Sequence, residues 1–149
     1  MSEAEGCEGG TVYHAVSNER QAQSVLNGID PKYFNEDSRF GGGFYVGNDA
    51  DTIVAELAEH GNDARYAINY DMNLTGQSVL DLTNPQVAAD WNYVQNLTST
   101  NACQSIGEVA RSQGYNVIKF QSYRGEGINY VLFNNFNQIL TPKIVVPVE

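Results

Sequence analysis

The stretch Ser38–Gly61, SRFGGGFYVGNDADTIVAELAEHG, constrains the fold more than any other part of the chain. A glycine run precedes β-forming residues, and these lead into an amphipathic segment. This order predicts a strand over 42–47 and a helix that begins after Asn48 or Asp49. The same stretch carries three side chains of the kinds that bind or react: Arg39, Tyr45 and Glu56.

The glycine run Gly41–Gly43 leaves two interpretations open. It can form a turn or bulge, or it can let a ligand lie close to the backbone. It is not a phosphate-binding loop, because no Lys-Ser or Lys-Thr pair follows it.

The rest of the chain reads as alternating short elements of one domain over residues 11–149, preceded by a flexible segment, 1–10. Helices are expected after the cap Ser17, from Pro85 to about Asn96, and over 102–114. Strands are expected over 11–17, 65–72, 78–83, 115–120, 128–134 and 138–148. The last two strands look like an antiparallel hairpin joined by NNFN. The fold class is therefore α+β.

Composition limits the function classes. The net charge of −10 disfavours a mainly electrostatic grip on nucleic acid or an anionic membrane, and suits a basic partner. No apolar run approaches 18 residues, so no membrane span is expected. Two histidines without ligand spacing predict no metal site, and nucleophilic catalysis has little support because there is no G-x-S-x-G motif.

Three candidate site residues each have a plainer interpretation. His14 shares a strand face with Val12 and Val16, which also suits a core histidine with one hydrogen-bonded nitrogen. Glu56 falls near the polar side of its helix, which also suits a solvated glutamate. Ser122 follows a probable strand and could simply form a turn.

The ordered series of segments resembles the ADP-ribosyltransferase superfamily, whose members often begin with a strand bearing Tyr-His. The series TVYHAVSNERQAQSVLNGID, SRFGGGFYVGNDADTIVAE, VLDLTNP and GYNVIKFQSYRGEGINYVLFN is more specifically similar to RES-type domains, the NAD-consuming toxin branch. The resemblance covers roughly residues 11–148. It implies an ADP-ribosyltransferase-like split antiparallel sheet with flanking short helices.

The resemblance implies roles for individual residues. Arg39 would pair with the NAD phosphates, and His14 would contact a ribose, although RES domains often have arginine near that point. Ser122 would lie near the nicotinamide ribose. Glu56 would be the RES glutamate. Tyr45 would stack on the nicotinamide ring. The wall of the pocket would be formed by Gly42, Gly43, Phe44 and Tyr45.

One departure leaves the catalytic carboxylate open. Superfamily transferases usually place a catalytic glutamate at the start of the strand over 128–134. This chain has Asn129 there, with Glu126 three places earlier. Either Glu126 reaches the site, or Glu56 serves instead, because cleavage of the nicotinamide–ribose bond needs a carboxylate beside an oxocarbenium-like transition state.

The resemblance therefore predicts an enzyme with NAD+ as substrate. The first hypothesis is an antibacterial toxin domain that transfers ADP-ribose to a translation component, either a translation GTPase or structured RNA. The chain also looks like the toxin tips of Rhs polymorphic proteins, which implies type VI or similar secretion, action in the target-cell cytoplasm and a cognate immunity protein. The alternative enzyme degrades NAD+ with water or phosphate as acceptor, and the non-enzymatic alternative is a binding module.

Overall fold

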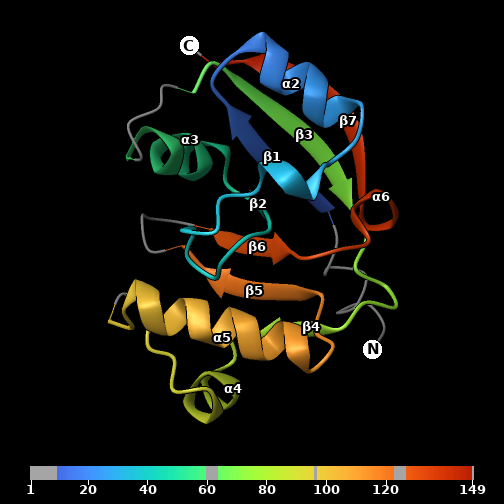
Figure 1. Ribbon diagram of the computed structural model, residues 1–149. Coiled ribbons are helices and arrows are strands. Elements are labelled where there is room, and N and C mark those ends of the chain that lie inside the picture. The colour runs from blue at the N-terminus through green and yellow to red at the C-terminus, as the bar shows by residue number, and fades with distance from the viewer. Residues whose placement is uncertain (1–9, 60–63, 96, 123–126, 149) are drawn as a thin grey trace.

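The computed structural model describes residues 10–59, 64–95, 97–122 and 127–148. Figure 1 shows the strands and helices coloured along the chain. The C-terminal strand lies at one edge of the sheet, and α4 lies outside α5. The elements are β1 (Gly10–Val16), α2 (Glu19–Leu26), a 3-10 turn η1 (Pro31–Tyr33), β2 (Phe44–Gly47), α3 (Ala50–Glu59), β3 (Tyr66–Met72), β4 (Val79–Asp81), α4 (Pro85–Asp90), α5 (Thr100–Ser112), β5 (Val117–Gln121), β6 (Ile128–Leu132), α6 (Phe136–Ile139) and β7 (Leu140–Pro147).

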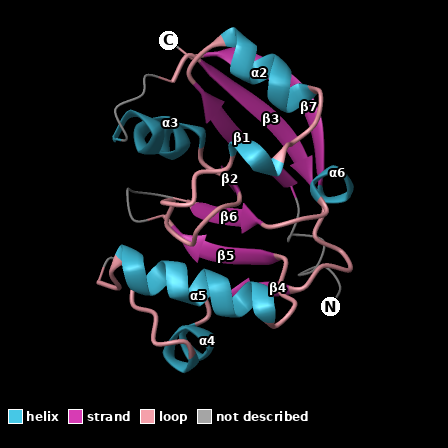
Figure 2. Ribbon diagram, viewed as in Figure 1, coloured by secondary structure: helices cyan, strands magenta, loops and turns pink. Residues whose placement is uncertain are grey.

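The strands form one seven-stranded sheet in the order β4-β5-β6-β2-β1-β3-β7, with helices packed around it (Figure 2). All described pairs are antiparallel except β4 with β5. The sheet is split at its centre, between β1 and β2. The only register pair described there is Tyr13 with Gly47, whereas β1 pairs with β3 along its whole length. The prediction of an α+β fold with a split, largely antiparallel sheet and short helices is confirmed.

Two hydrophobic cores cover opposite faces of this sheet. Along β6, Tyr130 and Leu132 belong to the first core and Val131 to the second, as strand alternation requires. The first core takes in residues of α2 and α6. The second is closed by the buried side of α5, through Cys103, Ile106 and Ala110. Helix α5 therefore forms the outer wall over the β4–β6 half of the sheet.

The predicted terminal hairpin is wrong. Strand β6 pairs with β2 and β5, while β7 pairs with β3 at the far edge. The NNFN segment does not turn tightly, because Phe136 and Ile139 pack into the first core as part of α6. The chain therefore crosses from the middle of the sheet to its edge (Figure 1).

Several element boundaries differ from the sequence predictions by a few residues, and two of the differences, at helix ends, have a clear cause. Asn18 rather than Ser17 caps α2, by accepting a hydrogen bond from the Gln21 amide. Helix α4 ends at Asp90 instead of continuing to Asn96, because Asn92 has a positive φ of 56° and the next residue, Tyr93, is buried in the second core. Within the described residues, no helix has the length and apolar character needed to cross a membrane.

Candidate functional site

The centre of the candidate site is the carboxylate of Glu56, which accepts hydrogen bonds from two buried polar side chains. The Ser122 hydroxyl donates to Oε2 at 2.6 Å. The Asn129 carboxamide donates to Oε2 at 2.9 Å and to Oε1 at 3.1 Å. Ser122 and Asn129 are buried and Glu56 is half-buried. Glu56 is therefore a fixed carboxylate and not a solvated helix residue.

Local structure aims these groups at one another. Asp49 caps α3 by accepting from the Thr52 amide at 3.1 Å, which confirms the predicted start of that helix. The Asn48 side chain accepts from the Ile128 amide at 2.8 Å, and so ties the start of β6 to the end of β2. Gly47 provides the space, because a Cβ there would overlap the side chains of Asn129 and Ile53.

The hydrogen bonds leave Glu56 with an unequal pair of oxygens. From the described residues, Oε2 takes two hydrogen bonds and Oε1 takes one. A carboxylate offers about four lone-pair sites in total. Oε1 is therefore the oxygen better placed to accept a hydroxyl or to face a positive centre.

Arg39 lies in a loop that the protein holds from one side through Tyr45. The Tyr45 hydroxyl accepts from the Phe40 amide and donates to the Gly41 carbonyl, both at 2.8 Å. Burial raises the pKa of Tyr45, although the Phe40 amide and the Arg111 and Arg39 charges oppose this rise. The neutral Tyr45 side chain therefore supports the loop through these two hydrogen bonds. Its stacking on a nicotinamide ring stays a prediction.

Helix α5 holds the same loop from the other side. Gln104 donates to the Ser38 carbonyl at 3.1 Å, and Arg111 donates to the Gly42 carbonyl at 3.2 Å. The Arg111 guanidinium also lies over the Phe133 ring, 5.0 Å from its centroid. Helix α5 therefore holds the backbone on both sides of Arg39.

The glycine run is explained by protein contacts and not by an open backbone surface. Gly41 has a positive φ of 89°, which favours glycine, and a Cβ on Gly43 would overlap the Val131 side chain. Gly41 and Gly42 are buried. The close-packed turn, one of the two interpretations from sequence, fits these contacts, and the role of Gly42 and Gly43 in binding a ligand stays a prediction.

The charge of Arg39 lowers the pKa of three side chains at the edge of the second core, against the effect of burial. Burial raises the pKa of Tyr93 and of Cys103, and in both cases the neighbouring Arg39 side chain opposes the shift. Arg39 acts on Tyr45 in the same sense. Its guanidinium therefore lies beside these side chains, on the α5 side of the sheet.

Phe120 of β5 connects the Arg39 loop with the Glu56 cluster. Its ring contacts Phe40 at a centroid distance of 4.8 Å and Tyr45 at 6.4 Å. It is also the register partner of Asn129 and lies two residues before Ser122, which directly follows the end of β5. Arg39, Tyr45, Glu56, Ser122 and Asn129 therefore belong to one face of the sheet.

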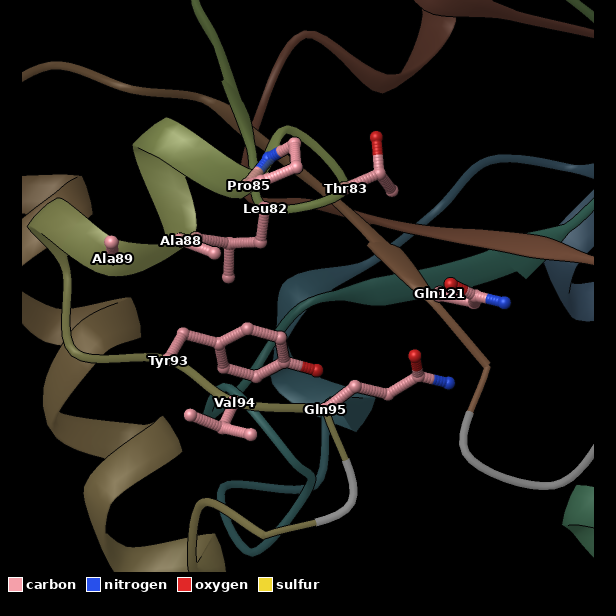
Figure 3. A pocket seen from close by; sticks show the side chains of 9 residues that line it. All are labelled: Leu82, Thr83, Pro85, Ala88, Ala89, Tyr93, Val94, Gln95 and Gln121. Atoms are coloured by element: carbon pink, nitrogen blue, oxygen red, sulfur yellow. The ribbon is translucent and has the colours of Figure 1, made fainter.

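A cavity of about 360 Å³ lies next to this face. Its lining comes from the ends of β4 and β5, from α4 and from the segment before α5 (Figure 3). Two lining residues touch the site: Tyr93 neighbours Arg39, and Gln95 donates to the Ser122 carbonyl at 3.1 Å. Sequence reasoning missed both, because it placed them inside a helix that in fact ends at Asp90.

His14 is not brought to the Glu56 cluster. Its ring stacks on Phe44 with centroids 4.1 Å apart, and its Nδ1 lies 2.8 Å from the Tyr45 carbonyl oxygen. Phe44 belongs to the first core, so alternation places His14 and Phe44 on the sheet face opposite Asn129. This matches the alternative of a structural histidine, and neither His14 nor Phe44 lines the Glu56 cluster.

The environment of His14 predicts a pH dependence of stability. Burial lowers its pKa from the ordinary 6.5, although the Tyr45 carbonyl opposes this shift. The unfolded chain therefore binds a proton below about pH 6.5 that the folded chain resists, so the free energy of unfolding falls as pH falls, by up to about 1.4 kcal/mol per pH unit for one proton. We expect His14→Gln to lose less stability than wild type between pH 7.5 and pH 5 in urea unfolding. Equal losses would show that His14 titrates normally in the folded protein.

Two predictions from sequence remain, on Glu126 and on metal binding. Glu126 lies outside the described residues. Among the residues that are described, no group of three or more His, Cys, Asp or Glu side chains could hold a metal ion.

The fold and the sequence of the chain both resemble known proteins. Over 94% of its length, the chain superposes on 84% of a chain in the crystal structure of the M. tuberculosis MbcT–MbcA toxin–antitoxin complex, with a TM-score of 0.61 and 17% identity. At that identity the likeness concerns the fold. No curated protein matches the chain. The model of the RES domain matches residues 11–147, so the chain belongs to the RES domain family.

Proposed function

We propose that this protein consumes NAD+ by cleaving the bond between nicotinamide and ribose, with water or phosphate as the acceptor. The observation that carries the proposal is the Glu56 carboxylate, fixed by Ser122 and Asn129 on the same sheet face as Arg39. Membership of the RES family supports it, because the RES resemblance implied NAD consumption.

The chemistry explains why a fixed carboxylate suffices. As nicotinamide leaves, positive charge develops at C1' of the ribose and its ring oxygen. A preoriented carboxylate stabilises that charge without reorganising during the reaction. Nicotinamide leaves as a neutral base, so no general acid is required. In this arrangement Oε1 of Glu56 faces the ribose, while Ser122 and Asn129 both donate to Oε2 and Asn129 also contacts Oε1.

Arg39 supplies the complementary charge. A guanidinium binds a diphosphate through paired, charge-assisted hydrogen bonds. Its loop is held by Tyr45, Gln104 and Arg111, so little ordering is needed when the substrate binds. The protein as a whole carries a net charge of −10, so a local cation matters for holding an anionic substrate.

Transfer of ADP-ribose to a macromolecule, the first hypothesis from sequence, becomes the second candidate. The family match favours NAD+ degradation over transfer to a translation component. The fold likeness to a chain of a toxin–antitoxin complex supports a toxin held in check by a cognate antitoxin or immunity protein. Delivery as a secreted Rhs-type effector stays a prediction.

The test is incubation of the purified protein with NAD+ carrying separate labels in nicotinamide and in the adenylate phosphate. We expect nicotinamide release without any lysate, with the second label in free ADP-ribose or, when phosphate is present, in its phosphorylated form. Chromatography of the small molecules measures both products. The same reaction with bacterial lysate shows whether any macromolecule becomes labelled.

Three results separate the candidate functions. Release that requires lysate and labels one band would replace degradation with transfer. Release without a labelled macromolecule supports degradation. No release from protein free of any inhibitor would leave a binding module.

A further inference from the structure

We infer that the cavity between α4 and the ends of β4 and β5 is the subsite for the adenosine half of the dinucleotide. This inference rests on the proposed function and adds to it a place for the part of the substrate that does not react. At about 360 Å³ the cavity lies at the lower end of ligand pockets, roughly 300–1,000 Å³. It therefore suits a nucleoside rather than a whole dinucleotide.

The walls of the cavity suit a flat, neutral ring. Leu82, Pro85, Ala88 and Val94 provide apolar surface, and Tyr93 adds an aromatic ring. In Figure 3 the side chains of Leu82, Ala88 and Tyr93 point towards the same space. Aromatic and aliphatic surface of this kind packs against either face of a purine.

The polar side chains of the cavity are Thr83, Gln95 and Gln121. The Thr83 hydroxyl donates to Asp81 and the Gln95 amide donates to the Ser122 carbonyl, so Gln121 is the side chain best able to read the edge of a base. A glutamine carboxamide can donate and accept at once, which is the pattern that pairs with the N6 and N7 edge of adenine. Gln121 is exposed and ends β5, so its carboxamide can turn to meet a base.

The charge of the lining residues decides which of the two rings, adenine or nicotinamide, the cavity favours. Of the described residues that line the cavity, none is charged at neutral pH, since burial raises the pKa of Tyr93. The nicotinamide ring of NAD+ is cationic, and an anionic neighbour would favour it. The described carboxylate in the cluster is that of Glu56, which lies beyond Ser122. The neutral cavity therefore suits adenine, and the cationic ring belongs beside Glu56.

The neighbours of the cavity place the two halves of the substrate in a consistent order. Tyr93 joins the cavity to Arg39, the proposed diphosphate ligand. Gln95 joins it to Ser122, whose hydroxyl touches Glu56. The inference therefore places the diphosphate at Arg39, the adenosine in the cavity and the nicotinamide ribose at Glu56.

The experiment compares two half-substrates, adenosine monophosphate and nicotinamide mononucleotide, on the full chain. Ala88→Leu places three extra carbons in the cavity. Gln121→Ala removes one base-reading group from an exposed position and protects the test if the first variant fails to fold. Ala102→Leu, an exposed alanine of α5, is the matched control. Calorimetry gives the affinities, and nicotinamide release gives kcat and KM.

We expect Ala88→Leu to weaken binding of adenosine monophosphate at least tenfold, and Gln121→Ala to weaken it about fivefold. KM for NAD+ should rise in step while kcat stays within twofold of wild type. Cleavage of nicotinamide mononucleotide should not change, because that substrate leaves the cavity empty. Ala102→Leu should match wild type throughout.

Two results would overturn the inference: unchanged binding of adenosine monophosphate in both folded cavity variants, or equal losses for the two half-substrates. Failure of the proposed function is distinguishable from either. If wild type cleaved neither NAD+ nor nicotinamide mononucleotide, the chemistry proposed for Glu56 would fall. Loss of adenosine monophosphate binding in Ala88→Leu but not in Ala102→Leu would still identify the cavity as an adenosine site.

Discussion

Replacing Glu56 with glutamine is expected to lower the rate of nicotinamide release by about a thousandfold, because the transition state loses its stabilising charge. The change keeps the size of the side chain, and Glu56 is only half-buried, so the thermal midpoint should move little. KM for NAD+ should change less than kcat, since the carboxylate acts mainly on charge that develops during the reaction. Nicotinamide release and thermal unfolding, measured on one preparation, check both parts.

The control for Glu56→Gln is Glu108→Gln, an exposed glutamate of α5, which should retain wild-type activity. Ser122→Ala and Asn129→Ala each remove donors to Glu56 and leave its charge, so each should cost less than Glu56→Gln itself. An active Glu56→Gln protein would move the catalytic role to another carboxylate, with Glu126 as the first to test.

Replacing Gly107 with alanine is expected to destabilise the protein, although alanine favours helix by about 1 kcal/mol over glycine. A Cβ at this position of α5 would overlap the carbonyl oxygen of Phe40 and lie 2.9 Å from its carbonyl carbon. Both are backbone atoms, so either the helix or the loop must move. Overpacking of this kind costs about 1–3 kcal/mol and occasionally more. We expect the clash to outweigh the gain in helix propensity, with a net loss of about 2 kcal/mol and a fall of about 4–8 °C in the thermal midpoint.

The same substitution should also weaken substrate binding, because Phe40 is the neighbour of Arg39. KM for NAD+ should rise in the folded fraction of Gly107→Ala at a temperature well below its midpoint. Ser105→Ala, an exposed change on the same helix, should alter neither stability nor KM. A Gly107→Ala protein more stable than wild type would show that α5 does not press against the Arg39 loop.

Local patterns in the sequence predicted most elements but not how they meet. The glycine, strand and helix order of residues 38–61 gave β2 and α3 almost as observed, because caps and alternation are local signals. The terminal hairpin failed because NNFN has turn-forming residues, while the packing of Phe136 and Ile139 decides the path. That packing depends on residues far away in the chain.

The site divides in the same way. Strand alternation correctly placed His14 on one face with Val12 and Val16, whereas the ribose contact that the resemblance implied for His14 stays a prediction. For Glu56 the opposite holds: the helical pattern suggested solvent, while the resemblance pointed to the site. A pattern along α3 shows its apolar stripe, but it cannot show that Ser122 and Asn129 come to the flank of that helix.

The distribution of the Glu56 cluster along the chain has a consequence for synthesis. Glu56 is separated from Ser122 by 66 residues and from Asn129 by 73. Strand β6, which carries Asn129, fits between β5 and β2 in the finished sheet. A nascent chain therefore has no complete cluster until β6 has emerged from the ribosome and paired with both neighbours. Under the proposed function, the cell that makes this protein meets no NAD+-consuming activity until translation has passed β6 (Ile128–Leu132).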